Sequence, residues 1–157
     1  MATLQEINRL NDHLKRAFEG EAWHGPALLS LLADVTAAQA AARPLAAAHS
    51  IWELVLHIAA WERAARHALA GQPIHVTDDE NFPAVTDTGE AAWQETLATL
   101  QYEHQLLQSA VARLTDADLD ASVPGGSYTF YYLLHGVVQH DLYHAGQIAL
   151  LKKGYPA

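Results

Sequence analysis

The sequence predicts an all-α protein, a four-helix bundle with a short extra helical segment between the first and second long helices. Four stretches carry apolar residues at steps of three and four, the spacing that places side chains along one side of a helix. Turn residues separate these stretches, and no pair of segments shows the alternation typical of paired strands. Because half of the 157 residues are apolar, we expect one domain, residues 1–157, with a substantial core.

The first long helix is expected at residues 3–20, with Gly20 as its stop. Residues 27–42 are expected to contain one or two shorter helical pieces, the second beginning at Thr36, before Pro44 ends them. The positions of the first helix that step by three and four are mostly apolar: Leu4, Ile7, Asn11, Leu14 and Phe18.

The second long helix is expected at residues 51–70. Ser50 and Glu53 have the spacing of a capping box, in which each side chain accepts a hydrogen bond from the other residue's backbone amide. Gly71 lies just beyond the predicted end, where glycine commonly terminates helices.

Residues 72–89 change in composition to Pro, Thr, Asp and Asn around the lone sequence Asn81-Phe82-Pro83. We interpret them as a long loop that crosses one end of the domain, in the manner of a lid. A loop of this length joins helices along the bundle as readily as in a hairpin, so periodicity alone leaves the topology open.

The third long helix is expected at residues 90–113 and the fourth at residues 129–153, with Gly154 as the C-cap of the fourth. Turn residues around Pro124 separate the two. The third helix has the clearest periodicity, a seam of alternate steps of four and three: Trp93, Leu97, Leu100, His104, Leu107, Val111 and Leu114.

Two histidines of the fourth helix, His140 and His144, are four residues apart and therefore lie on one side of that helix. Such a pair could be half of a metal site. The alternative is that both are core histidines whose nitrogens form hydrogen bonds with neighbouring groups. A third imidazole favours the metal site, because open zinc-type sites commonly have three protein ligands. His57 is the best candidate, since it faces inward from the second helix, and His104 is the competing one.

The remaining histidines are expected to serve other purposes. His135 is turned about 140° from His140 on a helical wheel, which suits packing rather than the same cluster. Five others occupy breaks, helix starts or polar surroundings and are expected at the surface or in caps: His13, His24, His49, His67 and His75.

The spacing of His140, Asp141 and His144 resembles the zinc-protease motif His-Glu-x-x-His, in which the glutamate is the general base. Here a shorter aspartate holds the position of that glutamate. The expected third ligand also lies upstream on another helix rather than downstream. We therefore disfavour a protease.

Composition excludes several function classes. Nine basic against eighteen acidic residues give a net charge of −9, which argues against nucleic-acid partners and against binding to anionic membranes. With no cysteine, any thiol in the chemistry must come from another molecule. The N-terminus has no secretion signal, and no apolar run reaches the length of a membrane helix, so we expect a cytoplasmic protein.

Two blocks of the sequence resemble the DinB-like (YfiT-like) family of bacterial proteins. They are HSIWELVLHIAAWE at residues 49–62, followed by LAGQPI at 69–74, and GVVQHDLYHAGQIALL at 136–151. The resemblance extends across nearly the whole chain. It implies a four-helix bundle, usually a homodimer, that holds a divalent metal with three histidines, which correspond here to His57, His140 and His144.

The resemblance also implies a function. Characterised members include transferases that use low-molecular-weight thiols such as bacillithiol or mycothiol, and many others are described as metal-dependent hydrolases or stress-induced proteins. We therefore expect a metal-dependent enzyme with a small-molecule substrate, either a thiol S-transferase or a hydrolase. The alternative is a non-catalytic metal or small-ligand binding protein of a stress response. Zinc or nickel is preferred as the metal, with iron and manganese as further options.

Three residues near the expected site have simpler interpretations. Glu53 lies one turn from His57 and is assigned to the capping box rather than to base catalysis. Trp61 and Tyr143 are assigned to core packing rather than to the lining of a pocket. No residue is assigned as general base or as cofactor ligand.

Overall fold

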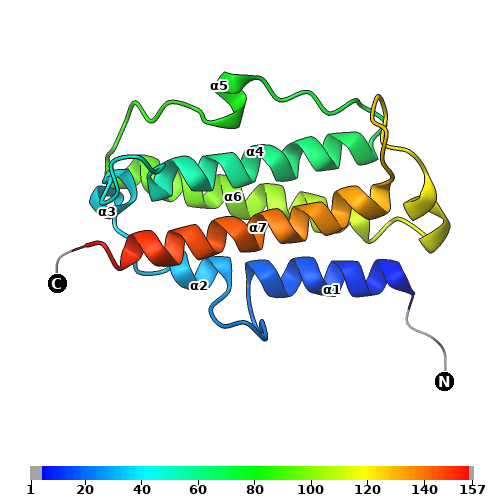
Figure 1. Ribbon diagram of the computed structural model, residues 1–157, viewed down its shortest axis with the longest axis horizontal. Coiled ribbons are helices and arrows are strands. Elements are labelled where there is room, and N and C mark those ends of the chain that lie inside the picture. The colour runs from blue at the N-terminus through cyan, green and yellow to red at the C-terminus, as the bar shows by residue number, and fades with distance from the viewer. Residues whose placement is uncertain (1–4, 156–157) are drawn as a thin grey trace.

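Four long helices form the body of the computed structural model, which describes residues 5–155 (Figure 1). They are α1 (Glu6–Phe18), α4 (Ile51–Leu69), α6 (Glu90–Val111) and α7 (Phe130–Lys152). The predicted start of the first helix, at residue 3, lies outside the described residues. Every other predicted end of the four long helices is confirmed to within two residues. Between residues 5 and 155 there is no strand, only one isolated bridge between Ser122 and Thr129.

Shorter helices occupy the connections. The predicted helical segment between the first two long helices is confirmed as two pieces, and the second begins after its N-cap Thr36 as expected. Two other short elements were not predicted, a single turn in the 72–89 loop and a 3₁₀ turn before α7. The short helices are α2 (Leu28–Leu32), α3 (Ala37–Ala41), α5 (Asp78–Asn81) and the 3₁₀ helix η1 (Asp116–Asp120).

The helices form an antiparallel arrangement of two parallel pairs. α1 and α7 run in one direction, and α4 and α6 run in the other (Figure 1). α4 packs against both α6 and α7, while α1 packs against α7 and α6. Since α4 and α6 are parallel, the chain between them must return along the full length of the bundle, with α5 against α4. The expectation that residues 72–89 cross one end of the domain is therefore wrong.

The start of α4 follows the capping box of Ser50 and Glu53. The Ser50 hydroxyl accepts from the Glu53 amide at 3.2 Å, and the Glu53 carboxylate accepts from the Ser50 amide at 2.7 Å. This reciprocal pair satisfies two amides that the first helical turn otherwise leaves without partners. It fixes the helical phase that turns His57 toward the interior, and it confirms the structural assignment of Glu53.

The end of α7 differs from the expectation. Gly154 does not adopt the left-handed conformation of a glycine C-cap. A Cβ atom at this position would lie 2.8 Å from Cβ of Pro44, so close approach of the preceding segment explains the glycine.

None of the helices between residues 5 and 155 combines the length and the apolar character that crossing a membrane requires.

The apolar core has two parts with a polar layer between them. One part is built around the first half of α4, and the other around α1 and the first half of α7. Between them, each of three helices buries one ionisable residue. We call these three residues, Glu62 of α4, His104 of α6 and Asp141 of α7, the buried polar layer; their exposed fractions are 0%, 2% and 0%.

Two leucines of α7 test the core assignment. Leu134 is fully buried in the second part of the core, whereas Leu150 is 62% exposed. Leu134→Ala should lower the free energy of unfolding by about 2–5 kcal/mol, because it removes buried methyl groups and leaves a cavity. Leu150→Ala should change it by less than about 0.5 kcal/mol. Urea denaturation followed by circular dichroism measures both, and equal losses would contradict the packing described here.

Candidate metal centre

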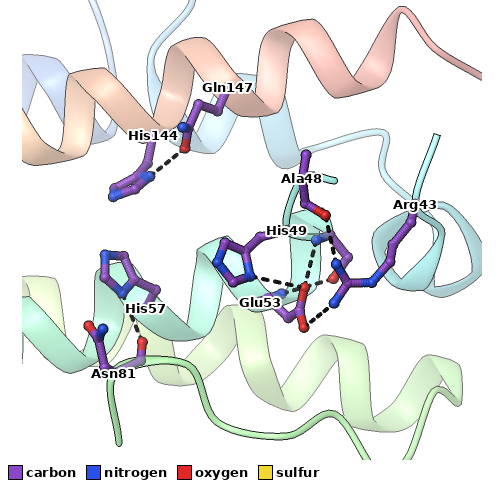
Figure 2. A network of polar contacts seen from close by, with 9 residues as sticks. Arg43, Ala48, His49, Glu53, His57, Asn81, His144 and Gln147 are labelled. Carbon is purple, nitrogen blue, oxygen red and sulfur yellow. Dashed lines mark hydrogen bonds and ion pairs between the residues drawn. The ribbon is translucent and has the colours of Figure 1, made fainter. Parts of the chain in front are cut away.

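Three histidines from two helices meet midway along the bundle, on the side of α4 that faces α7. His57 comes from α4, and His140 and His144 come from successive turns of α7. Figure 2 shows the rings of His57 and His144 pointing toward one another across the space between the helices. The structure thus brings together the three residues that the resemblance assigns as ligands.

The three rings present the same atom to one point. Nε2 of His140 lies 2.9 Å from Nε2 of His57 and 3.1 Å from Nε2 of His144. The ligand atoms of the three residues all lie within 4.8 Å of one another. At metal–nitrogen distances of about 2.0–2.1 Å, two imidazoles on one ion have nitrogens about 2.9–3.4 Å apart, depending on geometry. The observed separations therefore fit shared coordination of a divalent ion.

Outer hydrogen bonds set the tautomers of two rings. Nδ1 of His57 donates to the backbone oxygen of Asn81 at 2.8 Å, and Nδ1 of His144 donates to Oε1 of Gln147 at 2.7 Å (Figure 2). Both partners are oxygen acceptors, so each Nδ1 carries the proton and each Nε2 directs its lone pair inward. Metal-binding histidines typically have this arrangement.

Burial favours the neutral form of two of the three imidazoles. Desolvation lowers the pKa of His57, and it lowers the pKa of His144 to about 4. Neutral rings with free lone pairs are the form that binds a metal, so these two ligands require no deprotonation at neutral pH.

One side of the cluster is open. His57 and His144 are each only 7% exposed, whereas 25% of the His140 side chain is exposed to solvent. The ring of Tyr143 lies edge-on to His144, with its centroid at 5.1 Å, and this tyrosine is 66% exposed. The assignment of Tyr143 to core packing is therefore wrong. His140 is therefore the ligand candidate that the solvent reaches.

The segment between α4 and α6 covers another side of the cluster. Phe82 stacks on His57 at a centroid distance of 4.2 Å and on His49 at 3.7 Å. Trp61 is partly buried, and its indole nitrogen donates to the Asn81 side chain at 2.8 Å, so Asn81 bridges Trp61 and His57. Sequence reasoning gave Asn81 and Phe82 no role, although their isolation in a polar loop was a usable signal.

His104 and Asp141 do not join the three histidines. Nδ1 of His104 instead contacts Oε1 of Glu62 at 2.7 Å, so the competing third ligand is wrong. Asp141 points into the core and approaches His140 only at Nδ1, at 3.7 Å. Burial raises the pKa of Asp141, raises the pKa of Glu62 well above its usual value, and lowers that of His104 to about 3. Asp141 thus does not occupy the place of a protease base.

The histidine assigned to packing on α7 is also accounted for. His135 lies away from the cluster, 3.7 Å from the Glu6 carboxylate and 4.3 Å in ring centroid distance from Tyr131. His49, expected near a helix start, contacts Glu53 at 3.5 Å (Figure 2). Its ring also stacks on that of Phe82.

Comparison with known protein families places this chain in one family. The family profile described as the DinB superfamily matches residues 22–148, which include all three histidines of the cluster. The chain belongs to the DinB superfamily. Among curated proteins and solved structures, no match was found.

A substitution of Gln147 tests whether its side chain orients the imidazole of His144. Gln147→Leu removes the acceptor of the His144 Nδ1 proton and should weaken zinc binding about 10–100-fold, the usual effect of losing an outer partner of a metal ligand. Gln139→Leu, on the exposed side of the same helix, is the matched control and should leave the dissociation constant unchanged. Competition against a chromogenic chelator measures both constants. Equal affinities in the two variants would show that Gln147 does not orient a ligand.

Proposed function

We propose that this chain binds a divalent metal ion through His57, His140 and His144 and is a metal-dependent enzyme that transfers a low-molecular-weight thiol to an electrophilic small molecule. The observation that supports this proposal is the convergence of three Nε2 atoms from two helices with one side open to solvent. An all-imidazole donor set suits zinc or nickel best, with iron and manganese as further options. When bound, such an ion lowers the pKa of a coordinated thiol or water.

The surroundings of the cluster favour a thiol over water as the nucleophile. A thiol has an ordinary pKa of about 8.5 and needs little help to ionise, whereas water usually relies on a neighbouring base as well. Neither of the two nearby carboxylates faces the converging Nε2 atoms of the cluster. Glu53 accepts from Ser50 and pairs with Arg43, and Asp141 approaches His140 on the side away from Nε2. A hydrolase is therefore the second choice within the same proposal.

In this proposal the residues around the cluster orient the metal ligands and do not act as acids or bases. Asn81 and Gln147 hold two imidazoles in the tautomer that directs Nε2 inward. Phe82 stacks on His57 and limits the access of water on that side of the cluster, and Trp61 packs near both His57 and His140. Since the sequence has no cysteine, the thiol is a co-substrate, and it would enter past the exposed Tyr143.

The shortage of a free base also favours an alternative, a non-catalytic protein that stores or senses a metal or a small ligand. A fourth protein ligand in the metal-loaded form would support that alternative, because it would close the open position. The small-molecule substrate and the homodimer that the resemblance implies stay predictions.

A turnover assay tests the proposal. Zinc- or nickel-loaded protein should consume an electrophile such as a monohalobimane faster with bacillithiol, mycothiol or glutathione than the thiol reacts alone. His144→Ala should lose at least about 100-fold in rate, as expected when a metal ligand itself is removed. His135→Ala, from the same helix but outside the cluster, should keep the rate. If the loaded protein turns over neither the thiol pairs nor a panel of esters and amides, the enzyme proposal fails.

A further inference from the structure

The buried polar layer is a second convergence of ligand-type side chains, separate from the three histidines. Each member of the layer interrupts an otherwise apolar helix face. Glu62 lies between Ile58 and Ala65 on α4, and the other two members lie at the same level, His104 on α6 and Asp141 on α7. Their ligand-type atoms all lie within 4.8 Å of one another. Three helices thus place an ionisable group at the same depth in the core.

These groups are poorly satisfied by the protein itself. Nδ1 of His104 contacts Oε1 of Glu62, but Oε2 of Glu62, Nε2 of His104 and both carboxylate oxygens of Asp141 have no hydrogen-bond partner among residues 5–155. Within the same residues, no lysine or arginine forms an ion pair with Glu62 or Asp141. A buried polar group without a partner usually costs about 1–3 kcal/mol, and a charged one costs more.

The neighbouring arginines pair with a different carboxylate. Arg63 and Arg66, which flank this region on α4, both bind Glu103, at 2.8 Å and 3.1 Å, although Nε of Arg66 is buried without a partner. On the other side Phe18 of α1 stacks on His104 with parallel rings at 3.6 Å, which excludes a solvent channel there. A single proton shared between Glu62 and Asp141 would satisfy one oxygen of each and would leave the second Asp141 oxygen unpaired.

We propose that Glu62, His104 and Asp141 form a second divalent-cation site in the core of the bundle. One cation would neutralise the two carboxylates and engage all three side chains at once. The ligand atoms would be Nδ1 of His104 and Oε1 of Glu62, which lie 2.7 Å apart. Neighbouring ligands at about 2.1 Å from one ion lie about 3 Å apart, so these two atoms would have to separate only slightly. Buried carboxylate and histidine ligands on facing helices also hold metals in other helical bundles.

The two sites should differ in preference and in exchange. Two carboxylates and one imidazole favour manganese, iron or zinc, whereas three imidazoles favour zinc, nickel or copper. The polar-layer ligands are at most 2% exposed, so an ion bound there can leave only when the helices part. The ion of the histidine cluster has the open side past His140 and should exchange freely.

Metal counting separates the two sites. The full-length protein is produced in medium supplemented with Mn²⁺ or Zn²⁺, and bound metal is measured by mass spectrometry before and after exposure to EDTA. The unmodified protein should hold two equivalents, one of which resists the chelator for far longer. Glu62→Gln, which keeps the shape of the side chain, should lose the resistant equivalent, and His144→Ala should lose only the exchangeable one.

His104→Gln is the second test variant, and circular dichroism confirms that each variant folds before its metal is counted. Loss of the resistant equivalent in either folded variant supports the second site. A resistant equivalent that both variants keep, or an unmodified protein without one, would overturn it. Failure of the three-histidine centre gives a different result, because His144→Ala would then leave the metal content unchanged.

Discussion

The packing of α4 against α7 is the contact on which the rest of this structure depends. It buries the apolar faces of both helices and, at its midpoint, brings His57 to within 2.9 Å of His140. A shift of one residue along α4 would rotate His57 by about 100° and remove it from the cluster. The capping box at Ser50 and Glu53 therefore matters beyond local stability, since it sets where α4 begins.

The same contact has a cost that the fold must offset. Imidazoles and carboxylates in the middle of a bundle interrupt the apolar core, and the two core parts on either side supply the burial that holds the helices together. The segment between α4 and α6 contributes further burial, because Asn81 and Phe82 contact the His57 ring. Stability comes from the two ends of the bundle, and ligand chemistry is concentrated at its centre.

Much of this arrangement follows from local sequence patterns. The stepped apolar series predicted the long helices, the Ser50–Glu53 spacing predicted the start of α4, and the spacing of His140 and His144 predicted their shared side. Periodicity did not reveal that α4 and α6 are parallel, because it carries no information on helix direction. Glu62 was missed because a glutamate at the end of an apolar block resembles a surface residue until α6 and α7 cover it. Asn81 acts through its backbone oxygen, which no side-chain pattern reports.

The most direct test of the three-histidine centre is zinc-edge X-ray absorption on the Glu62→Gln variant loaded with one equivalent of zinc. The geometry predicts three imidazole nitrogens at about 2.0–2.1 Å and at least one further light ligand that exchanges with added thiol for sulfur at about 2.3 Å. A spectrum with fewer than three imidazoles would contradict the assignment of His57, His140 and His144. A spectrum that added thiol leaves unchanged would contradict the open position.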